Sequence, residues 1–192
     1  DVQNNYNTYF VPENAYLVVI GDVKFKDVKT AVEKLFSGWK KQSAPKNTYP
    51  NPTNVSNLQI DFVDVPNAVQ SEISLVNTIN LKMSDPDFFP AVIANQILGG
   101  DFNSYLNMNL REQHAWTYGA NSSIGSGKYV TKFKASSAVR NTVTDSAVVQ
   151  FVKEIKRIRT ERVDPEVLRN VKAGYIGRFV MQVEKPQAVA RY

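Results

Sequence analysis

The stretch that decides the fold is NQILGGDFNSYLNMNLREQHAWTYGANSS, residues 95–123. It predicts the end of one buried helix, a glycine break at Gly99-Gly100, a second helix and then a strand. Glycine is expected at this break because it readily takes the left-handed conformation that follows a helix C-terminus. Asp101 is a candidate cap for the second helix. The stretch therefore predicts a helix–helix–strand corner.

The second helix has two predicted faces. One face collects, at spacings of three and four, Phe102, Tyr105, Leu106, Asn109 and Leu110. Arg111 belongs to the opposite, polar face with Asn103, Ser104 and Asn107. After a short turn, Trp116, Tyr118 and Ala120 alternate with small or polar residues, which is the period of a strand. Arg111 and Tyr118 are thus placed where they can meet across the corner.

Residues 99–118 resemble the second-half signature of the insulinase/pitrilysin-type zinc peptidases. In that signature two glycines, a short helix ending Leu-Arg-Glu and a downstream tyrosine recur. Here these are Gly99-Gly100, Leu110-Arg111-Glu112 and Tyr118. The resemblance implies that Arg111 and Tyr118 bind a peptide substrate held at a zinc site on the other half of the enzyme.

The chain departs from that signature at two positions. Tyr105 stands where the family often has an arginine, which leaves the substrate preference open. Ala115 stands where glycine is common, which loosens the expected turn.

The composition indicates a folded protein. Of its 192 residues, 43% are hydrophobic and 11% aromatic, which is enough to bury a core. There is no cysteine, so disulfides and thiolate zinc sites are excluded. No apolar run approaches the roughly 18 residues of a membrane span, and DVQNNYNTYF at the N-terminus does not read as a signal peptide. We expect a soluble protein. The sequence does not define its compartment, which would be the periplasm or the exterior if the parent protein carries a signal peptide.

The net charge of +5 has a specific and a general interpretation. The specific one is nucleic-acid binding, and the general one is a basic surface. Lys132 and Lys134 alternate along a predicted strand, as on a solvent face. The basic residues of 153–162 are interleaved with Glu154 and Glu161, as on an ordinary solvated helix. We therefore expect a basic surface and no nucleic-acid partner.

Three segments are predicted along the chain. Residues 1–40 contain a buried strand at 15–21 and a helix at 25–39, which resemble the strand–helix pair that closes each half of these peptidases. Residues 41–57 form a linker rich in proline and asparagine. Residues 58–192 form the non-catalytic peptidase domain, truncated at its C-terminus because a second strand–helix pair would follow.

The sequence allows two alternatives for where residues 1–40 pack. They belong to the preceding half and remain as a neighbour, or they dock on residues 58–192 in place of the missing pair. Docking is favoured because an exposed apolar strand is an aggregation hazard.

The order of elements within residues 58–192 predicts the fold class. Strands are expected at 58–62, 72–78 and 129–135 in addition to the corner strand, and helices at 86–98, 142–160 and from 165 to 179 in addition to the corner helix. This order predicts an α+β fold with a mainly antiparallel sheet and helices packed on one face. The resemblance implies the insulinase/mitochondrial-processing-peptidase-like metallohydrolase fold.

The chain lacks the residues of a catalytic metal site. A zinc peptidase needs an open three-ligand site and a carboxylate that takes a proton, and the family provides these with H-x-x-E-H. Here the single histidine is His114, expected in an exposed turn. We predict no metal ligand and no catalytic residue in this chain, and zinc on a partner half in the same polypeptide or another subunit. A serine nucleophile is not indicated, because G-x-S-x-G is absent.

The functional prediction depends on the resemblance. By spacing alone, Arg111 fits a helix C-terminus and Tyr118 a core aromatic residue beside Trp116. The resemblance favours the non-catalytic, substrate-binding half of an insulinase/pitrilysin-type zinc metalloendopeptidase, inactive alone. The alternative is a scaffold or assembly protein on the same fold.

Overall fold

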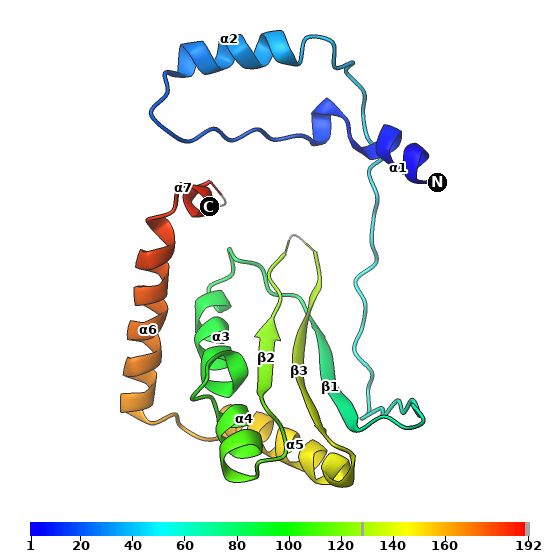
Figure 1. Ribbon diagram of the computed structural model, residues 1–192, viewed down its shortest axis with the longest axis vertical. Coiled ribbons are helices and arrows are strands. Elements are labelled where there is room, and N and C mark those ends of the chain that lie inside the picture. Colours follow the sequence, from blue (N-terminus) through cyan, green and yellow to red (C-terminus); the bar gives the residue numbers. More distant parts are fainter. Residues whose placement is uncertain (128, 191–192) are drawn as a thin grey trace. The chain divides into compact units, whose positions relative to one another are not determined.

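The fold is built on a three-stranded antiparallel sheet, described by a computed structural model that covers residues 1–127 and 129–190. Its strands are β1 (Gln70–Ile79), β2 (Ala120–Ile124) and β3 (Thr131–Arg140). The order is β1-β3-β2, so β3 lies between the other two (Figure 1). Together with the helices described next, this sheet confirms the predicted α+β class.

Helical segments cover one face of the sheet. They are α3 (Phe88–Asn95), the π-helical η2 (Gln96–Gly100), α4 (Tyr105–Asn107), the π-helical η3 (Met108–Gln113), the short η4 (Asn141–Val143) and α5 (Thr144–Thr160). The corner helix is therefore a short α-helical turn that continues into a π-helix. π-helical turns are rare and occur frequently at functional sites.

The core lies between these helices and the sheet. Its buried members are Ile73, Leu98, Leu106, Leu110, Ala120, Ala135, Val139, Ala147 and Phe151. Alternate residues of a strand point to opposite faces, so Ala135 and Val139 face the helices while Lys132 and Lys134 lie on the other face of the sheet. Ala135 and Ser137, two inward residues near the middle of β3, are small and buried, whereas Phe133 on the same face packs against the core.

The remaining helices are α1 (Val2–Tyr9), η1 (Pro12–Asn14), α2 (Phe25–Leu35), α6 (Pro165–Val183) and α7 (Pro186–Val189). The chain divides into two compact units, one of residues 51–175 and the other of residues 1–50 and those from 176 on. The predicted segment boundaries at 40 and 57, and the docking of residues 1–40, stay predictions. No helix of the described residues is both long and apolar enough to cross a membrane.

Two predicted strands are wrong. Residues 15–21 and 58–62 form no strand, and their apolar side chains are exposed, with Leu17 at 60% and Phe62 at 82%. A strand needs a neighbour for its backbone hydrogen bonds, and the sheet of the described residues contains only β1, β2 and β3. The two segments are apolar, but no described strand pairs with either of them.

The predicted role of the glycine pair is also wrong. Neither Gly99 nor Gly100 has a positive φ, and both lie within the π-helical η2. A Cβ atom on Gly99 would lie 2.5 Å from the backbone nitrogen of Ser122, so glycine is required here by the close approach of β2. Asp101 does not cap the next helix, because Ser104 is its N-cap residue and the Asp101 carboxylate instead accepts a bond from the Phe102 N–H.

Candidate functional site

The corner between η3 and β2 is fixed by backbone hydrogen bonds. The N–H of Trp116 donates to the carbonyl of Leu110 at 3.0 Å, and the carbonyl of Trp116 accepts from the N–H of Arg140 at 3.3 Å. Ala115 turns the chain with a φ of 52°, in the left-handed region. These contacts join the helix that carries Arg111 to the end of β3, and they place the loop that carries Tyr118 beside the same end.

Arg111 lies on η3 with its side chain 34% exposed. Its guanidinium carbon is 4.6 Å from the centre of the Phe102 ring. Its Nη1 is 3.0 Å from the Glu112 carboxylate, yet this buried atom makes no hydrogen bond within the described residues. The guanidinium is therefore held by an aromatic face and a carboxylate while one donor remains available.

Tyr118 lies in a bend just before β2, and 93% of it is exposed. Its neighbours are fixed, because the Ser137 hydroxyl donates to the Gly119 carbonyl at 2.8 Å and the Gly119 N–H donates to Thr117 Oγ1 at 3.1 Å. The interpretation of Tyr118 as a core aromatic residue is wrong, because the strand begins only at Ala120. No contact among those described joins the side chains of Tyr118 and Arg111.

Three buried asparagines tie the signature segment to its neighbours. Asn95 donates to the Ser122 carbonyl and accepts from the Ser122 hydroxyl at 2.8 Å. Asn107 donates to the Phe102 carbonyl at 2.8 Å and accepts from the Ala120 N–H. The predicted faces of this helix need correction, because Asn107 and Ser104 are buried whereas Phe102 is 59% exposed.

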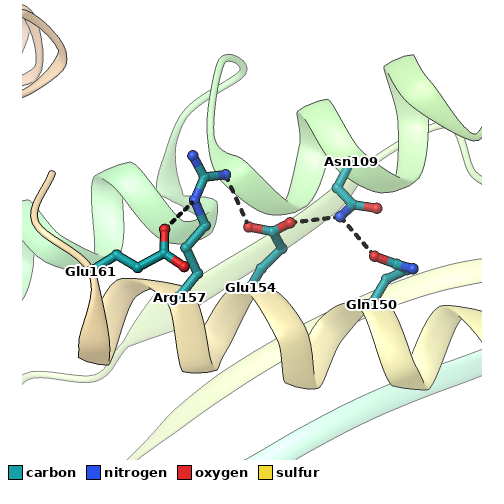
Figure 2. A network of polar contacts seen from close by, with 5 residues as sticks. All are labelled: Asn109, Gln150, Glu154, Arg157 and Glu161. Atoms are coloured by element: carbon teal, nitrogen blue, oxygen red, sulfur yellow. Dashed lines mark hydrogen bonds and ion pairs between the residues drawn. The ribbon is translucent and has the colours of Figure 1, made fainter. Parts of the chain in front are cut away.

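The third asparagine, Asn109, leads to a network that the sequence did not reveal (Figure 2). Its amide donates to the Glu154 carboxylate at 2.6 Å and to Gln150 at 3.0 Å. Glu154 is 3% exposed, so its expected place on a solvated face of α5 is wrong. The other carboxylate oxygen of Glu154 is 3.4 Å from Nη1 of Arg157. Nε of Arg157 is in turn 3.6 Å from the Glu161 carboxylate.

Buried atoms without hydrogen-bond partners are concentrated in this segment. Among the residues that the structure describes they are Ser104 Oγ, Asn109 Oδ1 and Arg111 Nη1. For Ser104 Oγ and Asn109 Oδ1 the cost is about 1–3 kcal/mol each, whereas Arg111 Nη1 is compensated by its ion pair with Glu112. All three atoms lie within residues 104–111.

The residues of this chain do not fit a zinc site. His114 is exposed in the turn after η3, and its ring stacks on Trp116 with centroids 4.1 Å apart. Within residues 1–127 and 129–190, no three side chains of the His, Cys, Asp or Glu type gather to hold a metal ion. A hollow of about 210 Å³ is lined by residues of the 51–54 segment, the end of β1 and Val130, and neither Arg111 nor Tyr118 contributes to it.

Comparison with known proteins gives matches over most of the chain. A family model described as the peptidase M16 inactive domain matches residues 1–175. A protease from Helicobacter pylori has a TM-score of 0.88 at 17% identity, over 98% of this chain and 46% of that one. A peptidase M16 inactive domain from Pseudomonas fluorescens has a TM-score of 0.65 at 20% identity, over 83% of this chain and 38% of that one.

A third similar structure is the periplasmic protease PqqL from Escherichia coli, with a TM-score of 0.64 at 16% identity over 89% of this chain and 19% of that one. At these identities the likeness shows the fold. The chain spans less than half the length of each of these proteins. No curated protein sequence matches it significantly.

Proposed function

This chain belongs to the family of peptidase M16 inactive domains, and from that premise we propose that it is the substrate-binding, non-catalytic half of a zinc metalloendopeptidase. In this proposal Arg111 and Tyr118 contact a peptide held at a zinc site on another half or subunit. The zinc is assigned to the partner because the donor set of this chain does not fit it.

The state of Arg111 is the observation that carries the proposal. Its guanidinium is held over Phe102 and beside Glu112, while the buried Nη1 makes no hydrogen bond. A guanidinium is a rigid fork of five donors that matches carbonyl and carboxylate oxygens. A peptide carbonyl or C-terminal carboxylate would accept from N–H groups of this guanidinium that the Glu112 ion pair leaves unused, and little side-chain freedom would be lost because the group is already held.

Tyr118 complements Arg111 as a second donor. Its side chain extends into solvent from a loop that is hydrogen-bonded on both sides. A phenol hydroxyl can donate to the oxyanion that forms when a peptide carbonyl is attacked. In this role it would bind the reacting carbonyl more tightly in the transition state than in the ground state.

We test the proposal in the complete enzyme with the substitutions Arg111→Ala and Tyr118→Phe. Loss of one oxyanion donor lowers the rate about a hundredfold in other hydrolases, so Tyr118→Phe is expected to lower kcat on this scale. Arg111→Ala is expected to raise KM as well, because it removes a ground-state contact. The measurement is steady-state cleavage of an internally quenched fluorogenic peptide.

Matched controls separate these effects from general damage. Tyr6→Phe removes a hydroxyl from a tyrosine of α1 that is 58% exposed and lies outside the apolar run at 15–20, and Arg169→Ala removes an arginine whose side chain is 73% exposed. Both controls should cleave at the unchanged rate. If the Arg111→Ala, Tyr118→Phe double variant also cleaves at the unchanged rate, the assignment is refuted and the scaffold role is favoured.

We propose further that residues 1–40, with the apolar run at 15–20 and the helix α2, form the closing unit of the preceding half and that residues 58–192 form the non-catalytic domain. The exposed apolar run at 15–20 is the reason, because such a segment favours a partner. Deletion of residues 1–40 is expected to lower the melting temperature and the solubility. Unchanged values would contradict docking.

A further inference from the structure

Glu154 is a buried carboxylate on a helix that otherwise buries apolar side chains. It lies one turn after Phe151 on α5 and is 3% exposed. Burial of a charge costs several kcal/mol unless it is paired and hydrogen-bonded. Replacement of such a buried pair by apolar residues is often neutral or stabilising, so the stability of the core alone does not account for a carboxylate here.

The partners of Glu154 fix the orientation of the Asn109 amide. The amide nitrogen faces two acceptors, the Glu154 carboxylate at 2.6 Å and Gln150 Oε1 at 3.0 Å (Figure 2). A flipped amide would place Asn109 Oδ1 against those acceptors, so only one orientation is satisfied. In this orientation its Oδ1 is buried without a hydrogen-bond partner among the described residues.

The network also contacts the beginning of the signature helix. Arg157, which is paired with Glu154, places its guanidinium carbon 3.9 Å from the centre of the Tyr105 ring. Tyr105 is the first residue of α4 and Asn109 lies in η3. The α5 side chains thus hold this helical segment at two points, four residues apart. A buried polar network of this kind selects one register more strictly than apolar packing does.

We infer that Glu154 is a positioning residue for Arg111. Arg111 follows Asn109 by two residues on the same π-helical turn, and the carbonyl of Leu110 between them anchors Trp116 at the corner. A carboxylate that fixes Asn109 therefore sets where the guanidinium of Arg111 emerges. The effect on catalysis rests on the proposed function, whereas the effect on the placement of Arg111 does not.

The test uses the complete enzyme with Glu154→Leu and, as a milder change, Glu154→Gln, which keeps an acceptor for Asn109. Two quantities are measured: kcat/KM on a fluorogenic peptide, and the rate at which phenylglyoxal modifies Arg111, followed by peptide mass spectrometry. A displacement of about 1 Å can lower a rate a hundredfold. We expect Glu154→Leu to lower kcat/KM by about 10- to 100-fold and to raise the Arg111 modification rate at least about twofold.

Glu161→Gln is the matched control. Glu161 pairs with the same Arg157 but its side chain is 66% exposed, so neither quantity should change. In an Arg111→Ala background the loss caused by Glu154→Leu should disappear, because the group that it positions is absent. The combination Asn109→Asp with Glu154→Gln reverses donor and acceptor and is expected to recover part of the activity.

The outcomes separate the two ideas. An unchanged Arg111 modification rate in folded Glu154→Leu overturns the positioning role, and so does an equal loss of activity with and without Arg111. If Glu154→Leu does not fold, the same two criteria apply to Glu154→Ala, which also removes the acceptor for Asn109. If Arg111→Ala alone leaves cleavage intact, the proposed function fails, while the modification rate still decides the role of Glu154.

Discussion

Gly99→Ala tests why glycine is needed between α3 and the signature helix. A Cβ atom at this position would lie 2.5 Å from the Ser122 nitrogen, 2.6 Å from its Oγ and 2.9 Å from the Asn121 carbonyl carbon. Two of these three atoms belong to the backbone of β2, so no side-chain rotation relieves the overlap. The nearest contact is about 1 Å shorter than the ~3.5 Å at which heavy atoms pack.

The magnitude follows from what must move. Overpacking of this kind costs about 1–3 kcal/mol. A shift of β2 also breaks the two hydrogen bonds between Asn95 and Ser122, each with a net value of about 0.5–1.5 kcal/mol. The higher helix propensity of alanine stabilises the folded state by about 1 kcal/mol and offsets part of this loss. We expect a net loss of about 3 kcal/mol, or roughly 6–12 °C in Tm for a chain of this size.

Gly100→Ala is the matched control for urea unfolding followed by circular dichroism. The three atoms nearest to its Cβ would all belong to the end of the Gln96 side chain, at 3.0–3.1 Å, and a flexible side chain can move. We expect a change within about 1 kcal/mol of zero for this variant. Equal losses for the two alanine variants would refute the close-approach argument and return the pair to an ordinary helix break.

Two further predictions concern stability. Ala115→Gly is expected to stabilise the chain by about 0.5–1 kcal/mol. A left-handed alanine costs about 1–2 kcal/mol, and the greater conformational entropy of glycine in the unfolded state offsets part of the gain from removing that cost. An unchanged or lower Tm would contradict the strain at φ 52°. Phe151→Ala is expected to cost about 3–5 kcal/mol in urea unfolding, whereas Val152→Ala, at a residue that is 48% exposed, should change stability by less than about 0.5 kcal/mol. Similar losses for the two would show that the buried face of α5 is assigned wrongly.

Elements with a strong local spacing lie where the sequence predicts them. The strands predicted at 72–78 and 129–135 overlap β1 and β3, and the helix predicted at 142–160 contains α5. The turn after the signature helix is also at its predicted place, whereas the strand predicted from Trp116 begins only at Ala120. These features depend on residues close together in the sequence, so a periodicity argument reaches them.

Features that depend on distant partners were not predicted. Glu154 is predicted on a solvated helix face, but the structure buries it, because Asn109 lies opposite it. The close approach of Gly99 to Ser122 likewise cannot be predicted from the presence of two adjacent glycines. The extended apolar runs at 15–20 and 58–62 needed a neighbouring strand, and sequence alone does not say which segment supplies it.

The strand order has a consequence for how the chain acquires its structure. β3 is separated from β2 by only a few residues in the sequence, but from β1 by roughly 50 residues. Local contacts form faster than distant ones, so the β2–β3 hairpin is expected to precede the arrival of β1. During synthesis β1 therefore leaves the ribosome well before its only partner among the described strands exists, and we expect its polar residues Ser71, Glu72 and Ser74 to limit premature association of this segment.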